Sequence, residues 1–166
     1  RTDRPDLCLT DDFQRSVEML KTYNMTFELQ GFSHQFVHFA ELVNNHPETN
    51  FCLVHGGMLT SDDDATVAAW KEGLEHLVPH QNIWIKCSGL NFFTAKCDID
   101  HMRIVLDHVL NRFGAERCFY GSNFPLEKLW ARYDDLVGAC KEILASRSEA
   151  EQRAFFHDTA AGFYRI

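Results

Sequence analysis

The chain alternates short apolar runs with longer amphipathic segments, and this alternation limits the fold more than any other feature. The apolar runs are Met25–Gln30, Asn50–His55, Ile83–Cys87 and Arg117–Tyr120. They recur at intervals of about thirty residues, and no hairpin turn signal joins any two of them. Strands that are separated by helices in this way are typical of parallel βαβ units. The pattern therefore predicts an α/β fold with four parallel strands.

The segments between these runs have the apolar spacing of helices. We predict helices over residues 11–23, 33–45 (with Ser33 as N-cap), 65–78, 99–113 and 129–144, and a short one from Ser148. Residues 1–9 read as a connecting segment, and the apolar tail 159–166 is predicted to pack. Most remaining histidines fall on helices or loops and are predicted to be solvated: His38, His46, His76, His80, His101, His108 and His157.

Length, charge and cysteine content limit the classes of protein to which the chain can belong. The 166 residues suit a single domain, residues 1–166, with a sizeable core. The net charge of -8 argues against nucleic acid and acidic membranes as partners. No apolar run approaches the roughly 18 residues that a membrane span needs. The six cysteines form no CxxC pair, which indicates a reducing compartment and favours the cytoplasm.

Each predicted strand ends in small or polar residues: Gln30-Gly31, His55-Gly56, Ser88-Gly89 and Ser122-Asn123. The carboxyl ends of parallel strands are where α/β folds bind ligands. The sequence therefore predicts a site for a small-molecule substrate at these four strand ends.

Further substrate contacts are predicted near the strand ends. Gln30 shares a face with Glu28 by alternation and lies nearer the site. Glu28 needs a partner, and Lys86 is the obvious one, so that catalysis and an interior ion pair both stay open. Ser88 lacks a nucleophile elbow and is predicted to contact substrate rather than attack it. His34 follows the first strand, where substrate contact and simple solvation are both open.

Five motifs occur in one order: L-V-H-G-G, W-K-E-G-L, N-I-W-I-K-C-S-G-L, F-G-A-E-R-C-F-Y-G-S-N-F-P and T-A-A-G-F-Y-R-I. From about Asp11 onward, the chain resembles on these motifs the amidohydrolase-related (amidohydrolase 2) family of TIM-barrel hydrolases, particularly its lactonase-like branch. The resemblance implies half of a (β/α)8 barrel, strands five to eight, without the N-terminal half and its His-x-His pair. We expect a truncated piece or a fragmentary gene product. The open inner face of a half-barrel invites a homodimer.

The resemblance also implies an activity for the full-length parent. It implies hydrolysis of a lactone or related cyclic ester or amide by water attack on a polarised carbonyl, with the fragment alone inactive. His55 stands where the family places a histidine that binds substrate or metal. Asn123 replaces the usual aspartate base, and an amide accepts no proton at neutral pH. Three readings stay open: Glu127 is the base, Asn123 orients water or substrate, or the site is inactive. The alternatives are a decarboxylase of the same superfamily and a non-catalytic binding or scaffold half-barrel.

A divalent metal, zinc or manganese, stays open for the full-length parent. For the fragment we predict no tightly bound catalytic metal, because a catalytic zinc site usually takes three protein ligands. His55 is the one strand-end histidine, and Asn123 is a poor zinc ligand. Cys52, Cys87 and Cys118 precede their strand ends and are expected to lie deeper than the site.

Overall fold

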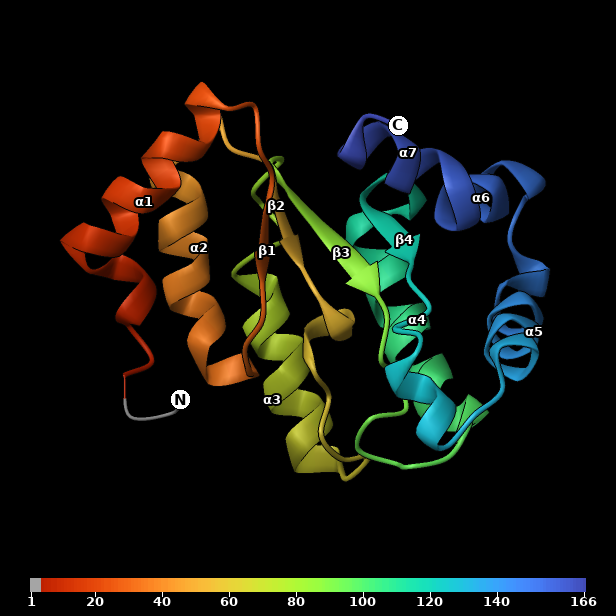
Figure 1. Ribbon diagram of the computed structural model, residues 1–166. Coiled ribbons are helices and arrows are strands. Elements are labelled where there is room, and N and C mark those ends of the chain that lie inside the picture. Colours follow the sequence, from red (N-terminus) through yellow and green to blue (C-terminus); the bar gives the residue numbers. More distant parts are fainter. Residues whose placement is uncertain (1–3) are drawn as a thin grey trace.

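Four parallel strands form one sheet in the computed structural model, which describes residues 4–166. The strands are β1 (Phe27–Leu29), β2 (Phe51–Leu53), β3 (Ile83–Cys87) and β4 (Cys118–Tyr120), and they lie side by side in chain order (Figure 1). All three pairings are parallel. This confirms the predicted half-barrel fold. Of the predicted connecting segment, residues 1–3 lie outside the described residues.

Helices connect the strands and follow the last one. They are α1 (Asp11–Thr22), α2 (Phe36–Asn45), α3 (Asp64–Glu75), α4 (Ile99–Phe113), α5 (Tyr133–Ile143), α6 (Glu149–Arg153) and α7 (Thr159–Tyr164). A π-helical turn, Ala154–Asp158, joins the last two. Short 3₁₀ turns cover Leu7–Leu9, Ser33–Gln35, His55–Gly57, Ala115–Arg117, Leu126–Leu129 and Leu144–Ser146.

Two helix starts differ from the prediction. Ser33 does not cap α2, because residues 33–35 form a 3₁₀ turn that is held by the Gln35 side chain, which accepts a hydrogen bond from the Phe32 N–H at 3.0 Å. Helix α5 begins at Tyr133 rather than near residue 129, since Leu129 ends a 3₁₀ turn and is 72% exposed. In both places, the segment that was predicted as the first turn of the helix forms a 3₁₀ turn instead.

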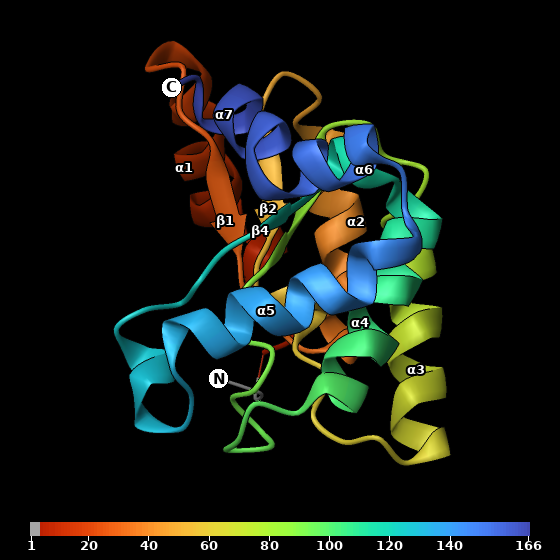
Figure 2. The same cartoon turned by 90° about the vertical axis from the view of Figure 1, so that its right-hand side faces the viewer.

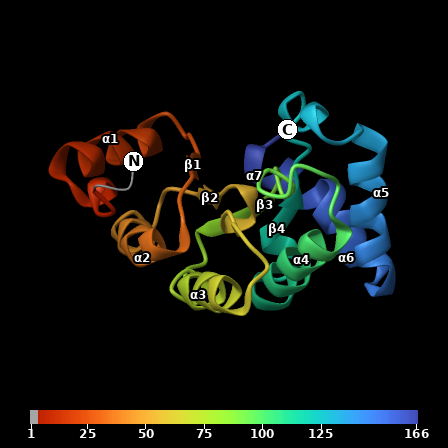
Figure 3. The ribbon, with the colours of Figure 1, turned by 90° about the horizontal axis from the view of Figure 1, so that it is seen from below.

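The outer face of the sheet carries the main core. Phe51 and Leu53 of β2, and Ile83 and Ile85 of β3, are fully buried there. Helices α2, α3 and α4 cover this face (Figure 3), and α5 lies along α4 (Figure 2). Full burial of each such side chain contributes about 1.5–3 kcal/mol. The core therefore fixes the sheet whose carboxyl ends carry the site.

The inner face is covered in part by the chain's own C-terminal helix. Phe163 of α7 lies 5.6 Å from the Phe119 ring and 5.3 Å from the Trp84 ring. Helix α7 lies near the amino ends of the strands (Figure 1). The prediction of an exposed or partner-covered inner face is therefore wrong at this end. Phe163 packs as predicted, but Ile166 is 93% exposed. The homodimer over the rest of the face stays a prediction.

Within residues 4–166, none of the helices has the length and apolar character to cross a membrane.

Candidate functional site

The carboxyl ends of the strands enclose a hollow of about 510 Å³. Its lining combines inner-face side chains with the loops that follow the strands: Glu28, Gln30, Val54, His55, Lys86, Ser88, Gly121, Ser122, Asn123 and Phe124. The structure thus brings together five of the seven predicted site residues: Gln30, His55, Lys86, Ser88 and Asn123. Glu127 and His34 are not part of this lining.

His55 lines the hollow and is held by one neighbour, Ser88. It starts a 3₁₀ turn with φ of 58°, a left-handed conformation that few non-glycine residues adopt. Its Nδ1 lies 3.1 Å from the Ser88 carbonyl oxygen and 3.1 Å from the Ser88 hydroxyl. Because a carbonyl oxygen only accepts, Nδ1 carries the proton. Nε2 is then left as the acceptor on this ring.

Asn123 and His55 flank the same glycine. A Cβ atom placed on Gly89 would lie 2.7 Å from His55 Nδ1 and 2.9 Å from Asn123 Nδ2. Gly89 itself has φ of 58°, and Asn123 has φ of 53°. Only a residue without a side chain fits between the two groups. Strained backbone at several neighbouring positions is a feature of functional sites.

Glu127 lies behind Asn123 and is 1% exposed. One carboxylate oxygen accepts a hydrogen bond from Trp130 Nε1 at 2.6 Å, and the other accepts from Asn123 Nδ2 at 3.4 Å. The carboxylate therefore contacts the site through the Asn123 amide. The placement of Glu127 therefore favours a role in orienting the Asn123 amide over a role as the base that takes a proton from water.

Lys86 and Glu28 form the predicted ion pair on the inner face, 2.9 Å apart. Tyr164 of α7 also donates to Glu28, and the Lys86 ammonium lies 5.6 Å from the Tyr164 ring centre. Partial burial opposes ionisation of Glu28, but the hydrogen bonds from Tyr164 and Lys86 outweigh it and hold the pKa of Glu28 below its ordinary value. The Glu28 carboxylate is thus held by Lys86 and Tyr164, and substrate contact by Gln30 stays a prediction.

His34 lies apart from the hollow. Its ring stacks on Phe32 at 6.3 Å, and it lines a separate depression beside Met58 and Trp70. The side chain is exposed to solvent. The structure therefore favours simple solvation over substrate contact for this histidine.

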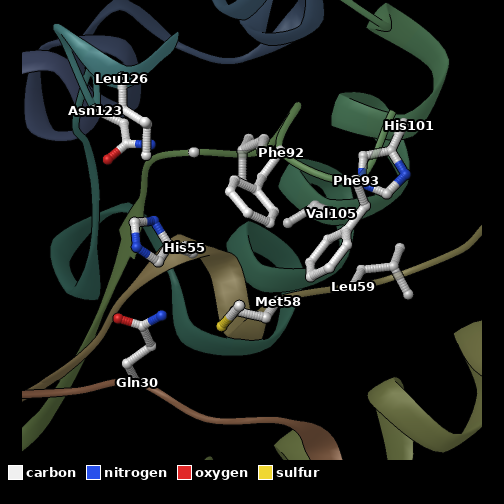
Figure 4. Close-up of a pocket in the computed structure, with 12 residues that line it drawn as sticks. Gln30, His55, Met58, Leu59, Phe92, Phe93, His101, Val105, Asn123 and Leu126 are labelled. Atoms are coloured by element: carbon white, nitrogen blue, oxygen red, sulfur yellow. The ribbon is translucent and has the colours of Figure 1, made fainter. Parts of the chain in front are cut away.

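A second cavity of about 200 Å³ opens beside the hollow and shares Gln30, His55 and Asn123 with it. Its remaining wall is mostly apolar: Met58, Leu59, Gly89, Leu90, Phe92, Phe93, His101, Val105 and Leu126 (Figure 4). Volumes of this order far exceed the about 10–15 Å³ that one water requires. The apolar cavity extends the site away from the strand ends.

The sequence prediction missed His101 in this cavity wall. His101 is 1% exposed, His46 is 7% exposed, and Nε2 of His108 is buried without a hydrogen-bond partner in the described residues. The prediction that these three histidines are solvated is therefore wrong. His46 contacts Gln14 and Glu18 between α1 and α2. A signal for His101 was present, since it precedes the buried Val105 by one helical turn.

The described residues do not supply a complete metal site by themselves. Within residues 4–166, no group of three or more histidine, cysteine, aspartate or glutamate side chains is arranged to hold a metal ion. His55 is the candidate ligand at the hollow, and Asn123 beside it is a weak one. A catalytic metal at the hollow would need further ligands besides His55 and Asn123.

Two curated relatives match nearly the whole chain. An uncharacterised protein, y4mH, of Sinorhizobium fredii is 29% identical over 164 residues, which cover 99% of this chain and 55% of the relative. The L-fucono-1,5-lactonase of Burkholderia multivorans is 28% identical over 166 residues, 93% of this chain and 56% of the relative. The chain thus spans about half the length of the curated relatives it matches.

Solved structures also match this chain. An amidohydrolase from Burkholderia multivorans, crystallised with bound zinc, superimposes with a TM-score of 0.92 at 26% sequence identity. The match covers 100% of this chain and 61% of that one. A sequence model of the amidohydrolase family matches residues 3–166. On this match, the chain belongs to the amidohydrolase family.

Proposed function

We propose that the full-length protein containing this half-barrel hydrolyses a lactone or a related cyclic ester or amide. The observation that carries the proposal is the arrangement of His55 and Asn123 across Gly89, with Nε2 of His55 left free by the Ser88 contacts. The similarity to the Burkholderia lactonase supports the substrate class.

The geometry supports a proton-accepting role for His55. Asn123 cannot accept a proton, Glu28 is engaged by Lys86 and Tyr164, and Glu127 lies behind Asn123. Neutral imidazole accepts a proton near neutral pH. Water attacks the carbonyl carbon while Nε2 of His55 takes its proton. The ring C–O or C–N bond then breaks as the leaving oxygen or nitrogen takes that proton from Nε2, which returns the imidazole to its neutral form. Asn123 and Gln30 hold the water and the carbonyl in line.

The test compares products. The full-length protein is assayed on sugar lactones and on aromatic carboxylic acids, with ring-opened acid and carbon dioxide measured as separate products. We expect ring-opened acid, and His55→Gln lowers its rate about 100- to 10,000-fold, the range for loss of a general base. His34→Gln, at an exposed histidine outside the hollow, is the matched control and leaves the rate unchanged.

Other outcomes point to the alternatives. Carbon dioxide without ring-opened acid would assign the protein as a decarboxylase. A rate that is the same in wild type and His55→Gln would remove His55 from the chemistry. No product from either panel would favour a binding or scaffold role.

A further inference from the structure

We infer that the Asp62–His101 pair is a substrate-recognition element that accepts a hydrogen bond from a hydroxyl group on the non-reacting part of the substrate. The inference rests on the proposed function, because the apolar cavity that holds His101 opens onto the hollow around His55. It adds a specificity determinant outside the strand ends.

The pair is fixed in place at the cavity wall. His101 lies in the first turn of α4 and is almost fully buried, and its ring is part of the cavity lining (Figure 4). Its Nδ1 lies 2.5 Å from an oxygen of the Asp62 carboxylate, in the loop before α3. Asp62 is half-exposed and contacts the ring from outside the core. Such a buried, oriented imidazole is costly unless its polar atoms are used.

The Asp62 contact decides which nitrogen meets a ligand. A carboxylate accepts only, so Nδ1 of His101 donates to it and Nε2 becomes the acceptor of the neutral ring. In the described part of the chain, no hydrogen bond is formed by this Nε2. Nε2 of His101 also keeps some exposed surface. Among the described residues, the fully buried side-chain polar atoms without a hydrogen-bond partner are His108 Nε2 and Tyr120 Oη, and His101 Nε2 is not one of them. A donor in the cavity would complete its hydrogen bonding.

Charge favours a neutral hydroxyl over an anionic group. Two carboxylates face His101: Asp62 on its ring and Asp98, which accepts a hydrogen bond from the His101 backbone N–H at 3.3 Å. The Lys96 ammonium is paired with Asp98 at 2.8 Å. A ligand carboxylate would therefore meet negative charge, whereas a hydroxyl donates to Nε2 without that cost.

The rest of the wall fits the carbon skeleton of a small ring. Phe92 and Phe93 pack edge to face, 5.1 Å apart, and lie between His55 and His101 in the cavity (Figure 4). Val105 and Leu90 add aliphatic surface. Aromatic and aliphatic walls with one convergent polar group are typical of ligand sites. The cavity thus selects a compact ring that carries a hydroxyl at the end remote from the reacting carbonyl.

The experiment measures binding, so that it does not depend on turnover. Three non-hydrolysable rings of similar size serve as probes: hydroxymethyl-tetrahydropyran, methyl-tetrahydropyran and tetrahydropyran carboxylate. Dissociation constants for the full-length protein come from NMR titrations that follow the resonances of each probe, so that wild type and the His101 variants are measured in the same way. We expect the hydroxymethyl probe to bind about three- to tenfold more tightly than the methyl probe, the equivalent of one hydrogen bond. The carboxylate probe binds most weakly.

Variants separate recognition from folding. His101→Leu removes the preference for the hydroxymethyl probe, and His101→Gln, which keeps an acceptor, restores part of it. Asp62→Asn changes a half-exposed position and weakens the preference without loss of the fold. His76→Leu, at an exposed histidine after α3, is the control and keeps the full preference.

Equal binding of the hydroxymethyl and methyl probes by wild type would overturn the inference. Tightest binding of the carboxylate probe, or an unchanged preference in His101→Leu, would do the same. Failure of the proposed function looks different: the wild type would prefer the hydroxymethyl probe yet open no lactone. The reverse result, lactone hydrolysis without any probe preference, would leave the proposed function intact and reject this subsite.

Discussion

Gly89→Ala perturbs the position where the His55 and Asn123 side chains meet. The new Cβ would lie 2.7 Å from His55 Nδ1 and 2.9 Å from Asn123 Nδ2, both far inside van der Waals contact. The backbone at this position also has φ of 58°. The substitution therefore acts on stability through the backbone and on the site through the displaced imidazole.

The magnitude follows from these two effects. A left-handed conformation costs an L-residue about 1–2 kcal/mol relative to glycine. Displacement of His55 from Ser88 removes contacts worth about 0.5–1.5 kcal/mol. We expect a total loss of about 1.5–3.5 kcal/mol in the free energy of unfolding.

Denaturant unfolding of the full-length protein, with NMR of the His55 imidazole, provides the assay. Gly138→Ala is the matched control, because that glycine lies within α5 and a Cβ there meets nothing within 4 Å. The control is expected to raise stability by up to about 1 kcal/mol. A Gly89→Ala protein with wild-type stability and unshifted His55 resonances would refute the reasoning.

Three further predictions concern the inner face and His55. Lys86→Met lowers the free energy of unfolding at neutral pH by about 1 kcal/mol, discounted for the 40% exposure of Glu28. Burial of Glu28 acts against ionisation, but Tyr164 and Lys86 hold its pKa below the ordinary value, so its stabilising effect is complete above that value and is lost as pH falls through the lowered pKa. Unfolding curves from neutral to acidic pH check both points, and an unchanged acid limb in the variant would contradict them. Ser88→Ala lowers kcat less than about tenfold, since the backbone carbonyl still holds His55 Nδ1, and a loss as large as that of His55→Gln would contradict this. After chelation and reloading with zinc or manganese, elemental analysis of residues 1–166 gives substoichiometric metal, and stoichiometric retention that disappears in His55→Ala would reject that prediction.

The local sequence pattern was sufficient to predict the bounds of an element where residues within or beside the segment mark its ends. The strand Ile83–Cys87 and the helix Ile99–Phe113 have the bounds that the sequence predicted. Each has an unbroken apolar period, and Asp98 and Gly114 mark the two ends of the helix. The parallel arrangement followed from helix-length connections alone.

Long-range packing was beyond the reach of sequence pattern. The tail was predicted to pack, but the inner-face partners of Phe163, which are Trp84 and Phe119, carry no local signal for one another. Glu127 looked available in the sequence because its burial behind Asn123 depends on the turn that contains it.

His101 was missed for a different reason. Its spacing places it on the buried side of the helix with Val105, but histidine is more often exposed than buried, and residue type outweighed position. Asp62, its partner, lies 39 residues earlier in the chain. Only the folded arrangement joins the two.

Hydrolysis in heavy-oxygen water tests the role of His55 most directly. The full-length protein is given a lactone in labelled water, and the ring-opened acid is examined by mass spectrometry. We predict one labelled oxygen in the new carboxylate, formed at a rate that His55→Gln lowers at least about 100-fold while His34→Gln does not. Unlabelled product, or equal rates in wild type and His55→Gln, would contradict water attack assisted by His55.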